Sequence, residues 1–235
     1  MTVKRPLNLN DLTWVEVKRY LERRKDILLP FGSVEEHGYH LPLSTDGDIA
    51  LGIAEELSAK TGVVIAPLIW YGVSNTTRGY VGTTMVGFDT LKAYCGDILA
   101  GLKESGFEIV YIISGHFSGS QTSAIKEAAR SIDDLECYLL DFSRIDTSDI
   151  LETQPFHACE AETSLMLYLH PQKVDMDKAV DEKIVSRKFA IKGGIEKTDS
   201  GVFGSPTKAT REKGEKLFER ITDELTAFIL SKQKV

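Results

Sequence analysis

The sequence contains few cysteines and no arrangement of them that would build a structural framework. Three occur in 235 residues, at Cys95, Cys137 and Cys159. They are scattered and odd in number, and no C-x-x-C pair is present, so neither a disulfide scaffold nor a cysteine-rich zinc site is expected. Isolated thiols suit a reducing compartment, and we expect the protein to be cytoplasmic.

Long apolar runs and excess positive charge are also missing. The first residues, MTVKRPLNLNDL, lack the apolar core of a signal peptide, and no segment approaches the roughly 20 apolar residues that cross a bilayer. The net charge is −7, so no basic surface points to nucleic acid or to an anionic membrane. We therefore expect neither nucleic acid nor membrane as a partner.

Low-complexity tracts, internal repeats and Pro/Ser linkers are absent, which predicts a single domain over residues 1–235. Strand-like and helical patterns alternate along the chain. Strands are expected at 26–30, 63–65, 108–113 and 137–140, and helices at 13–25, 48–59, 88–104, 121–132, 160–169 (or from 157) and 209–230. This alternation predicts an α/β fold, a three-layer α/β/α sandwich with a mostly parallel central sheet.

One stretch that is present is unusually rich in possible metal ligands. Residues 30–46 read PFGSVEEHGYHLPLSTD and follow an apolar strand. Side chains in loops after strands commonly build the sites of α/β enzymes, and carboxylates with imidazoles at close spacing suit zinc, manganese or iron. A polar surface loop is the alternative interpretation. The metal-capable residues are Glu35, Glu36, His37, His40 and Asp46.

Two further segments place histidines at the ends of expected elements. His116 follows the apolar run EIVYII, in the sequence SGHFSGS, and His157 opens HACEAETS, which also holds Glu160 and Glu162. Because loops after parallel strands meet at one edge of the sheet, we expect His116 to converge with residues 35–46.

The spacing of the first stretch favours two metal ions over one. Glu35 and His37 alternate, so in an extended segment their side chains point to opposite sides. Two ions about 3.5–4 Å apart can use both residues if a carboxylate bridges the ions. Asp46 is the natural bridge, and His116 is the natural ligand from the second segment. This pattern predicts a hydrolase in which metal-activated water attacks a carbonyl.

The residues of the third segment have several possible roles in such a site. His157, Glu160 and Glu162 are available for proton transfer, for completing the ligands of the second metal, or for orienting ligand histidines through hydrogen bonds.

The same residues resemble the signature of the creatininase (creatinine amidohydrolase) family. Residues 30–46 are similar to P-x-G-S-x-E-Q-H-G-x-H-L-P-L-x-T-D, SGH at 114–116 to the family's N-G-H, and residues 157–164 to its H-A-G-x-x-E-T-S. Gly82-Thr83 matches a G-T in the middle of the family's chain, and SGVFGSPT at 200–207 matches its S-G-V-x-G-x-P block. The matches run in the family's order.

This resemblance implies an α/β/α domain that binds two divalent transition metals per chain, zinc, iron(II) or manganese, and hydrolyses a C–N bond of a small amide. It implies that Glu35, His37 and His116 bind the metals and that Asp46 bridges them. His157 would carry a proton to the leaving nitrogen. The resemblance also implies a homo-oligomer, between a dimer and a hexamer.

Several positions differ from creatininase itself. Ser118 replaces a Glu that reaches the second metal there, so we expect Glu162 to complete that metal's ligands and to take part in catalysis. Ser114 replaces the usual Asn, Gly119 replaces a second common Asn, and Ser74-Asn75 stands where many relatives carry a His. These differences argue against creatinine as the substrate.

The compact chain is more similar to the archaeal members, which deformylate a formamidopyrimidine ribonucleotide on the way to flavins and a deazaflavin coenzyme. That resemblance predicts a 2-amino-5-formylamino-6-ribosylaminopyrimidinone 5′-phosphate deformylase, a function that makes a nucleotide the substrate. Creatinine or another small cyclic amide is the alternative.

Other polar residues are expected to surround the substrate or to support the ligands. His40 and Glu160 are expected to support ligands through hydrogen bonds, and Glu36 either to do the same or to face solvent. Arg78 would be available for a phosphate. The residues expected to contact the substrate are Ser74, Arg78, Thr83, Phe117 and Ser118.

Three other functions fit the sequence less well. A serine hydrolase needs its nucleophile in G-x-S-x-G, and GHFSG at 115–119 fails that spacing. A dinucleotide-dependent oxidoreductase needs G-x-G-x-x-G after a strand, which is absent. A non-catalytic metal- or nucleotide-binding regulatory module would leave the set of Glu, His and Asp residues without a role.

Overall fold

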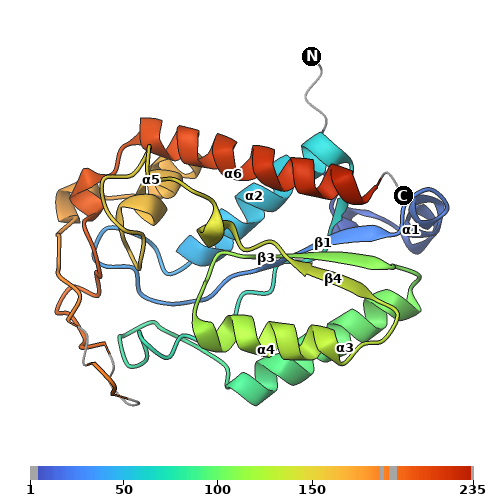
Figure 1. Ribbon diagram of the computed structural model, residues 1–235, viewed down its shortest axis with the longest axis horizontal. Coiled ribbons are helices and arrows are strands. Elements are labelled where there is room, and N and C mark those ends of the chain that lie inside the picture. The colour runs from blue at the N-terminus through green and yellow to red at the C-terminus, as the bar shows by residue number, and fades with distance from the viewer. Residues whose placement is uncertain (1–4, 186–187, 191–194, 234–235) are drawn as a thin grey trace.

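The computed structural model contains a parallel sheet of four strands with helices on both faces (Figure 1). The structure describes residues 5–185, 188–190 and 195–233. The strands are β1 (Asp26–Phe31), β2 (Val64–Ile65), β3 (Ile109–Ser114) and β4 (Glu136–Leu139), in the order β2-β1-β3-β4. Each strand pairs in parallel with its neighbour, which confirms the predicted α/β fold.

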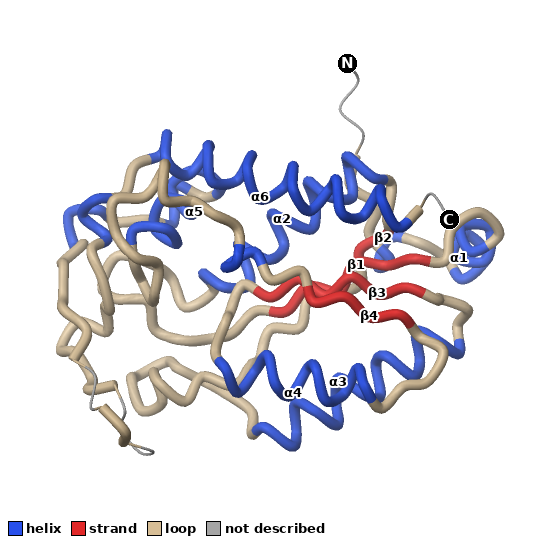
Figure 2. Tube along the Cα trace, viewed as in Figure 1, coloured by secondary structure: helices blue, strands red, loops and turns tan. Residues whose placement is uncertain are grey.

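The helices form the two outer layers. They are α1 (Trp14–Leu21), α2 (Thr45–Thr61), α3 (Phe88–Glu104), α4 (Gly119–Arg130), α5 (Glu160–Leu169) and α6 (Arg211–Lys232). In Figure 2, α2, α5 and α6 lie on one face of the sheet and α3 and α4 on the other, as the three-layer prediction requires. No helix in the described part of the chain is long and apolar enough to cross a membrane.

The strands are nearly all apolar because their side chains serve two cores. Leu28 and Tyr111 belong to the core shared with α2, α5 and α6, whereas Ile27 and Val110 belong to the core shared with α3 and α4. Successive side chains of a strand point to opposite faces, so a sheet covered on both sides needs continuous apolar runs.

Pro30 lies in the interior strand β1 without interrupting the sheet. Its carbonyl accepts a hydrogen bond from Ile69 N at 3.0 Å, and the N–H and C=O groups of one strand residue point to the same side. The donor that proline lacks would therefore face the side on which β2 has already ended at Ile65.

α1 begins where its capping box predicts but ends early. The side chains and backbones of Thr13 and Glu16 form both bonds of the box. The predicted end at residue 25 is wrong, because Arg24 leaves the helix: its guanidinium lies 2.9 Å from Asp26 Oδ2 and donates to Thr61 O. These bonds tie the start of β1 to the end of α2.

α2 begins earlier than its apolar pattern predicts. The pattern places the first helical residue near 48, whereas the helix starts at Thr45 and Asp48 N bonds to Ser44 O at 2.8 Å. Asp46 therefore lies in the first helical turn instead of a loop. A carboxylate is favoured there, since the amino end of a helix carries partial positive charge.

Candidate metal centre

The segments that contain the possible metal ligands meet at one edge of the sheet. β1 leads into the segment with Glu35 and His37, the adjacent strand β3 leads into His116, and the first turn of α2 carries Asp46. In a parallel sheet the carboxyl ends of neighbouring strands point the same way, so loops that are distant in sequence share this edge.

A glycine allows the end of β3 to approach α2 closely. A Cβ atom on Gly115 would lie 2.0 Å from the carbonyl oxygen of Asp46, which is far inside van der Waals contact. With glycine there, the next residue, His116, places Nδ1 3.2 Å from Asp46 Oδ2.

Six side chains form overlapping groups of possible metal ligands. The groups are Glu35, Asp46 and His116; His37, Asp46 and Glu162; and Glu35, His37 and His157, each with its ligand atoms within 4.8 Å of one another. Asp46 belongs to the first two, and its oxygens face different histidines: Oδ1 lies 3.2 Å from His37 Nε2, and Oδ2 lies 3.2 Å from His116 Nδ1. One carboxylate thus lies between two ligand groups.

Backbone carbonyls fix the orientation of three histidines in the centre. The pairs are His37 Nδ1 with Glu35 O at 3.1 Å, His116 Nε2 with Val73 O at 3.2 Å, and His157 Nε2 with Glu36 O at 2.8 Å. A carbonyl oxygen only accepts, so these nitrogens carry hydrogen, and the opposite ring nitrogens face the carboxylates, with a lone pair in the neutral ring and a proton in the charged one. Metal-binding histidines are typically held in this way.

Three carboxylate oxygens at the centre are buried and, among the described residues, have no hydrogen-bond donor while the facing rings are neutral: Glu35 Oε1, Asp46 Oδ2 and Glu162 Oε2. Glu35 Oε1 lies 2.7 Å and Asp46 Oδ2 3.2 Å from the same nitrogen, His116 Nδ1. Lone pairs therefore face lone pairs unless a cation, either a proton or a metal ion, lies among them. The mixed imidazole and carboxylate set fits divalent transition metals.

The pKa values within the centre are shifted in the directions that favour positive charge beside the carboxylates. Burial works to raise the pKa of Asp46, but His37 and His116 outweigh it and hold that pKa below its usual range. Burial works to lower the pKa of His37, but Asp46 outweighs it and raises the pKa to about 10. His116 behaves alike: Glu35 and Asp46 overcome burial and raise its pKa well above the ordinary value.

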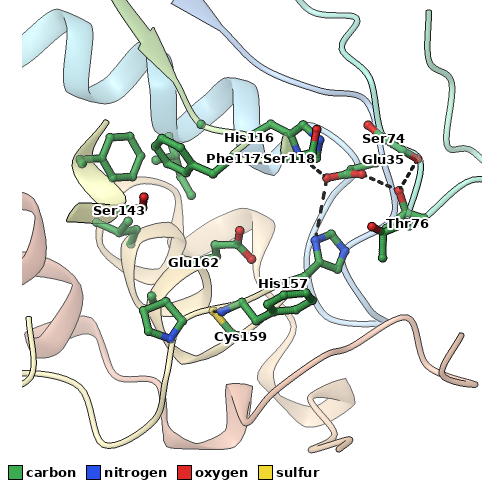
Figure 3. A pocket seen from close by; sticks show the side chains of 18 of the residues that line it. Glu35, Ser74, Thr76, His116, Phe117, Ser118, Ser143, His157, Cys159 and Glu162 are labelled. Carbon is green, nitrogen blue, oxygen red and sulfur yellow. Dashed lines mark hydrogen bonds and ion pairs between the residues drawn. The ribbon is translucent and has the colours of Figure 1, made fainter. Parts of the chain in front are cut away.

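A cavity of about 680 Å³ opens onto this centre (Figure 3). Glu35, His116, His157 and Glu162 all line it. Glu162 stands between His157 and Phe117 in Figure 3, and its Oε2 lies 4.0 Å from His37 Nε2. Burial raises the pKa of Glu162, although His37 and His157 oppose the shift.

Three of the five residues predicted to contact the substrate line the cavity: Ser74, Phe117 and Ser118. Thr83 does not, and its Oγ1 instead accepts a hydrogen bond from Glu36 N at 3.0 Å. Arg78 is exposed and lies outside the cavity lining. Within one loop Ser74 turns inward and Arg78 outward, a distinction that loop composition does not encode.

The two residues predicted to support the ligands, His40 and Glu160, form their hydrogen bonds with residues outside the six possible ligands. His40 Nε2 pairs with Thr163 Oγ1 at 2.9 Å, and burial lowers the pKa of His40 to about 4. Glu160 accepts from Thr153 N at 2.8 Å and from Lys213 Nζ at 2.5 Å. Glu160 therefore anchors the loop before α5 to α6, and the prediction that it orients a ligand is corrected.

Glu36 takes one of its two expected roles, a hydrogen bond to a histidine of the centre, whereas Thr77 has a role that the sequence interpretation missed. Glu36 is buried, and its Oε1 lies 3.1 Å from His157 Nε2. Thr77 donates to Glu35 Oε2, which leaves Oε1 of that carboxylate directed at the centre. No local pattern in the sequence marks Thr77.

Gln121 in α4 connects the end of β3 to two loops around the centre. Its Nε2 donates to Gly32 O at 3.2 Å and to Ser114 Oγ at 3.1 Å, and its Oε1 accepts from Val73 N at 3.0 Å. The carbonyl of Val73 is the one that holds His116. Gln121 thus supports a ligand through the backbone, and nothing in the sequence distinguishes it from an ordinary helix residue.

Comparison with known proteins shows to which family the chain belongs. The family model described as creatininase, creatinine amidohydrolase, matches residues 10–229. The chain belongs to the creatininase family. The family predicted from the motifs is thereby confirmed.

Two curated relatives of this creatininase-family chain differ in their activities. The mycofactocin precursor peptide peptidase of Mycolicibacterium smegmatis is 28% identical over 211 residues, 84% of this chain and 81% of that protein. The creatinine amidohydrolase of Pseudomonas putida is 26% identical over 238 residues, 90% and 91% of the two chains. Membership therefore does not by itself specify a substrate.

Solved creatininase structures share the fold. A structure described as creatininase Mn has a TM-score of 0.85 at 24% identity and covers 98% of this chain and 100% of that one. A mutant creatininase of the Zn–Zn type has a TM-score of 0.81 at 24% identity, over 97% and 98% of the chains. At this identity the likeness shows the fold.

Replacing Asp46→Asn should remove most of the bound metal, because it takes away the charge that both ligand groups share. We expect the reconstituted wild-type chain to retain about two ions and the variant fewer than about one, measured by atomic emission after desalting. Asp48→Asn is the matched control: it lies in the same helical turn, but its carboxylate pairs with Lys173 and Ser44. Full metal content in Asp46→Asn would contradict the bridging role.

Metal binding should release protons at neutral pH. His37, whose pKa is raised to about 10, is protonated in the metal-free protein below that pH, and only the neutral ring can bind a metal. We expect about one proton released per ion and an apparent affinity that rises with pH. Calorimetry in buffers of different ionisation enthalpy measures this, and a binding heat independent of the buffer would exclude it.

Proposed function

We propose that this chain, acting as a single domain, is a metal-dependent amidohydrolase that hydrolyses a C–N bond of a small amide or formamide. The observation that supports this most directly is Asp46, shared between two ligand groups at the edge of a cavity. Zinc, manganese and iron(II) suit the donor set, and the creatininase structures described as Mn and Zn–Zn forms agree with the first two.

The residues of the chain would hold the ions and prepare the site for an amide. Glu35, Asp46 and His116 would bind one ion, and His37, Asp46 and Glu162 the other. Two such ions supply an activated water and polarise the amide carbonyl. Thr77 keeps Glu35 directed at the centre by holding its other oxygen.

His157 is placed to move a proton at the cavity wall. Its Nε2–H donates to the Glu36 carbonyl at 2.8 Å, so Nδ1 carries the lone pair, and this nitrogen lies 3.8 Å from Glu35 Oε1. The side chain is 12% exposed to the cavity. It can accept a proton there and deliver it to the leaving nitrogen, the step that an amide leaving group requires.

The more specific function, a formamidopyrimidine-ribonucleotide deformylase, is less well supported by the residues that line the cavity. Phosphate recognition usually relies on Arg, Lys or clustered backbone amides. The described residues that line the cavity include no Lys or Arg, and Arg78 lies outside it. The lack of basic side chains among these lining residues favours an uncharged amide, whereas the amino end of α4, which lines the cavity at Gly119 and Ser120, suits a phosphate, so both substrates are tested.

A substrate panel tests the proposal. Protein reconstituted with zinc, manganese or iron(II) should hydrolyse uncharged amides or formamides, detected as released amine or formate, and the metal-free protein should be inactive. The panel includes the formamidopyrimidine ribonucleotide and creatinine. Asp46→Asn, purified in parallel, controls for contaminating amidases. A fully metal-loaded protein that hydrolyses none of these amides would rule the proposal out.

His157→Ala should keep both ions and lose turnover. Removing positioned proton transfer typically lowers kcat by about 10²–10⁴-fold. The measurement pairs metal content with kcat, and substrates with better leaving groups should recover part of the loss because they need less help from an acid. Loss of metal in this variant would instead make His157 a ligand, in line with its place beside Glu35 and His37.

We further propose that the protein is cytoplasmic and forms a homo-oligomer. All three cysteines are free, which suits a reducing compartment. The oligomer is implied by the family resemblance, and its size is open to measurement by light scattering.

A further inference from the structure

The cavity extends well beyond the metal centre into an apolar chamber. Its side chains come from the segment 142–151, from α5 and from α6. The chamber is lined by Phe142, Ile145, Leu151, Leu165, Leu217 and Ile221. In Figure 3 Glu162 lies between the two parts, with His157 and Glu35 on one side and Ser143 on the other. The chamber is therefore continuous with the place where the amide would react.

The chamber walls are held in place by the fold. α5 and α6 pack so closely that a Cβ on Gly214 would lie 1.9 Å from Ser164 O. Phe142 packs edge-on against Phe117 with ring centroids 4.6 Å apart. The loop before α5 is tied to α6 by Lys213, whose Nζ lies 2.5 Å from Glu160 Oε1. A preformed wall loses little entropy when a ligand fills it.

Charge is confined to one end of the cavity. Among the described lining residues, the ionisable acids and bases that could carry charge near neutral pH are Glu35, His116, His157 and Glu162, and all belong to the metal centre. A charged group placed against these apolar side chains would lose its water and, among the described lining residues, find no oppositely charged side chain beyond the metal centre, which is costly. An apolar group would instead gain from leaving water.

We propose that the chamber binds an apolar, uncharged substituent of the substrate, so that the substrate is a hydrophobic amide with an aliphatic or aromatic group next to the scissile C–N bond. The inference rests on the proposed function for the position of that bond at the metals. The whole cavity, metal end included, has a volume of about 680 Å³, which is within the range of sites for drug-sized ligands. A bare formamide would leave most of it empty.

Straight-chain hydroxamates test the chamber without requiring hydrolysis. Each member of a series from acetyl to octanoyl carries the same metal-chelating group, so differences in affinity report the tail alone. Calorimetry on the metal-loaded protein should show binding that tightens by about threefold to fourfold per methylene until the chamber is full. Tails of equal length that end in an amine or carboxylate should bind at least about tenfold more weakly. A flat series, or equal binding of charged tails, would overturn the proposal.

A matched pair of variants locates the effect. Ile145→Asn, in the chamber wall, should reduce the gain per methylene and leave the affinity for acetohydroxamate within about twofold. Ile150→Asn changes the same residue type in the same segment, but Ile150 does not line the cavity, so it should keep the wild-type gain. An unchanged gain in Ile145→Asn would refute the assignment of this wall.

The two proposals fail in different ways. If affinity rises with tail length but no amide is hydrolysed, the chamber stands and the amidohydrolase proposal falls. If amides are hydrolysed with no preference for apolar tails and the hydroxamate series is flat, the chamber proposal alone falls.

Discussion

The site depends on the shared carboxylate Asp46 and on the burial of three carboxylates beside three imidazoles. Buried charge is costly unless it is compensated, and among the described residues several acid oxygens have no donor while the facing rings are neutral. The backbone carbonyls that fix the histidine rings leave one ring nitrogen of each to face the acids. Each feature favours a cation among these groups, either protons on the rings or two divalent ions in their place.

Holding such a cluster together requires a rigid surrounding structure. The end of β3 can lie against α2 because Gly115 has no side chain. The side-chain amide of Gln121 bonds to the end of β3 and to two loops, and so supports the residue whose carbonyl orients His116. Thr77 and Glu36 perform similar tasks for Glu35 and His157. These neutral or peripheral residues give the ligands their geometry, although none of them would bind a metal.

Much of this arrangement can be derived from the sequence. Strands buried on both faces are apolar throughout, and helices buried on one side have apolar residues at helical spacing, so both can be located in the sequence. The alternating order of these β and α segments predicts the parallel sheet. The alternation of Glu35 and His37 predicts separate ligand groups, and the structure has such groups around Asp46, but it also brings Glu35 and His37 together in a group with His157. The start of α2 is an exception: the apolar pattern places it near residue 48, because the polar first turn, which holds Asp46, contributes nothing to that pattern.

The sequence by itself determined the family, the layer architecture and the set of possible ligands, because these follow from local periodicity and from side-chain chemistry written along the chain. Only the tertiary structure decided which residues support the centre, and that the wall beyond it is apolar. Three polar residues near the motifs lie outside the cavity lining: Thr83 and Glu160 form hydrogen bonds with other segments, and Arg78 is exposed to solvent. Leu217 and Ile221, in a carboxyl-terminal helix without any motif, line it, because packing between distant segments has no local signature.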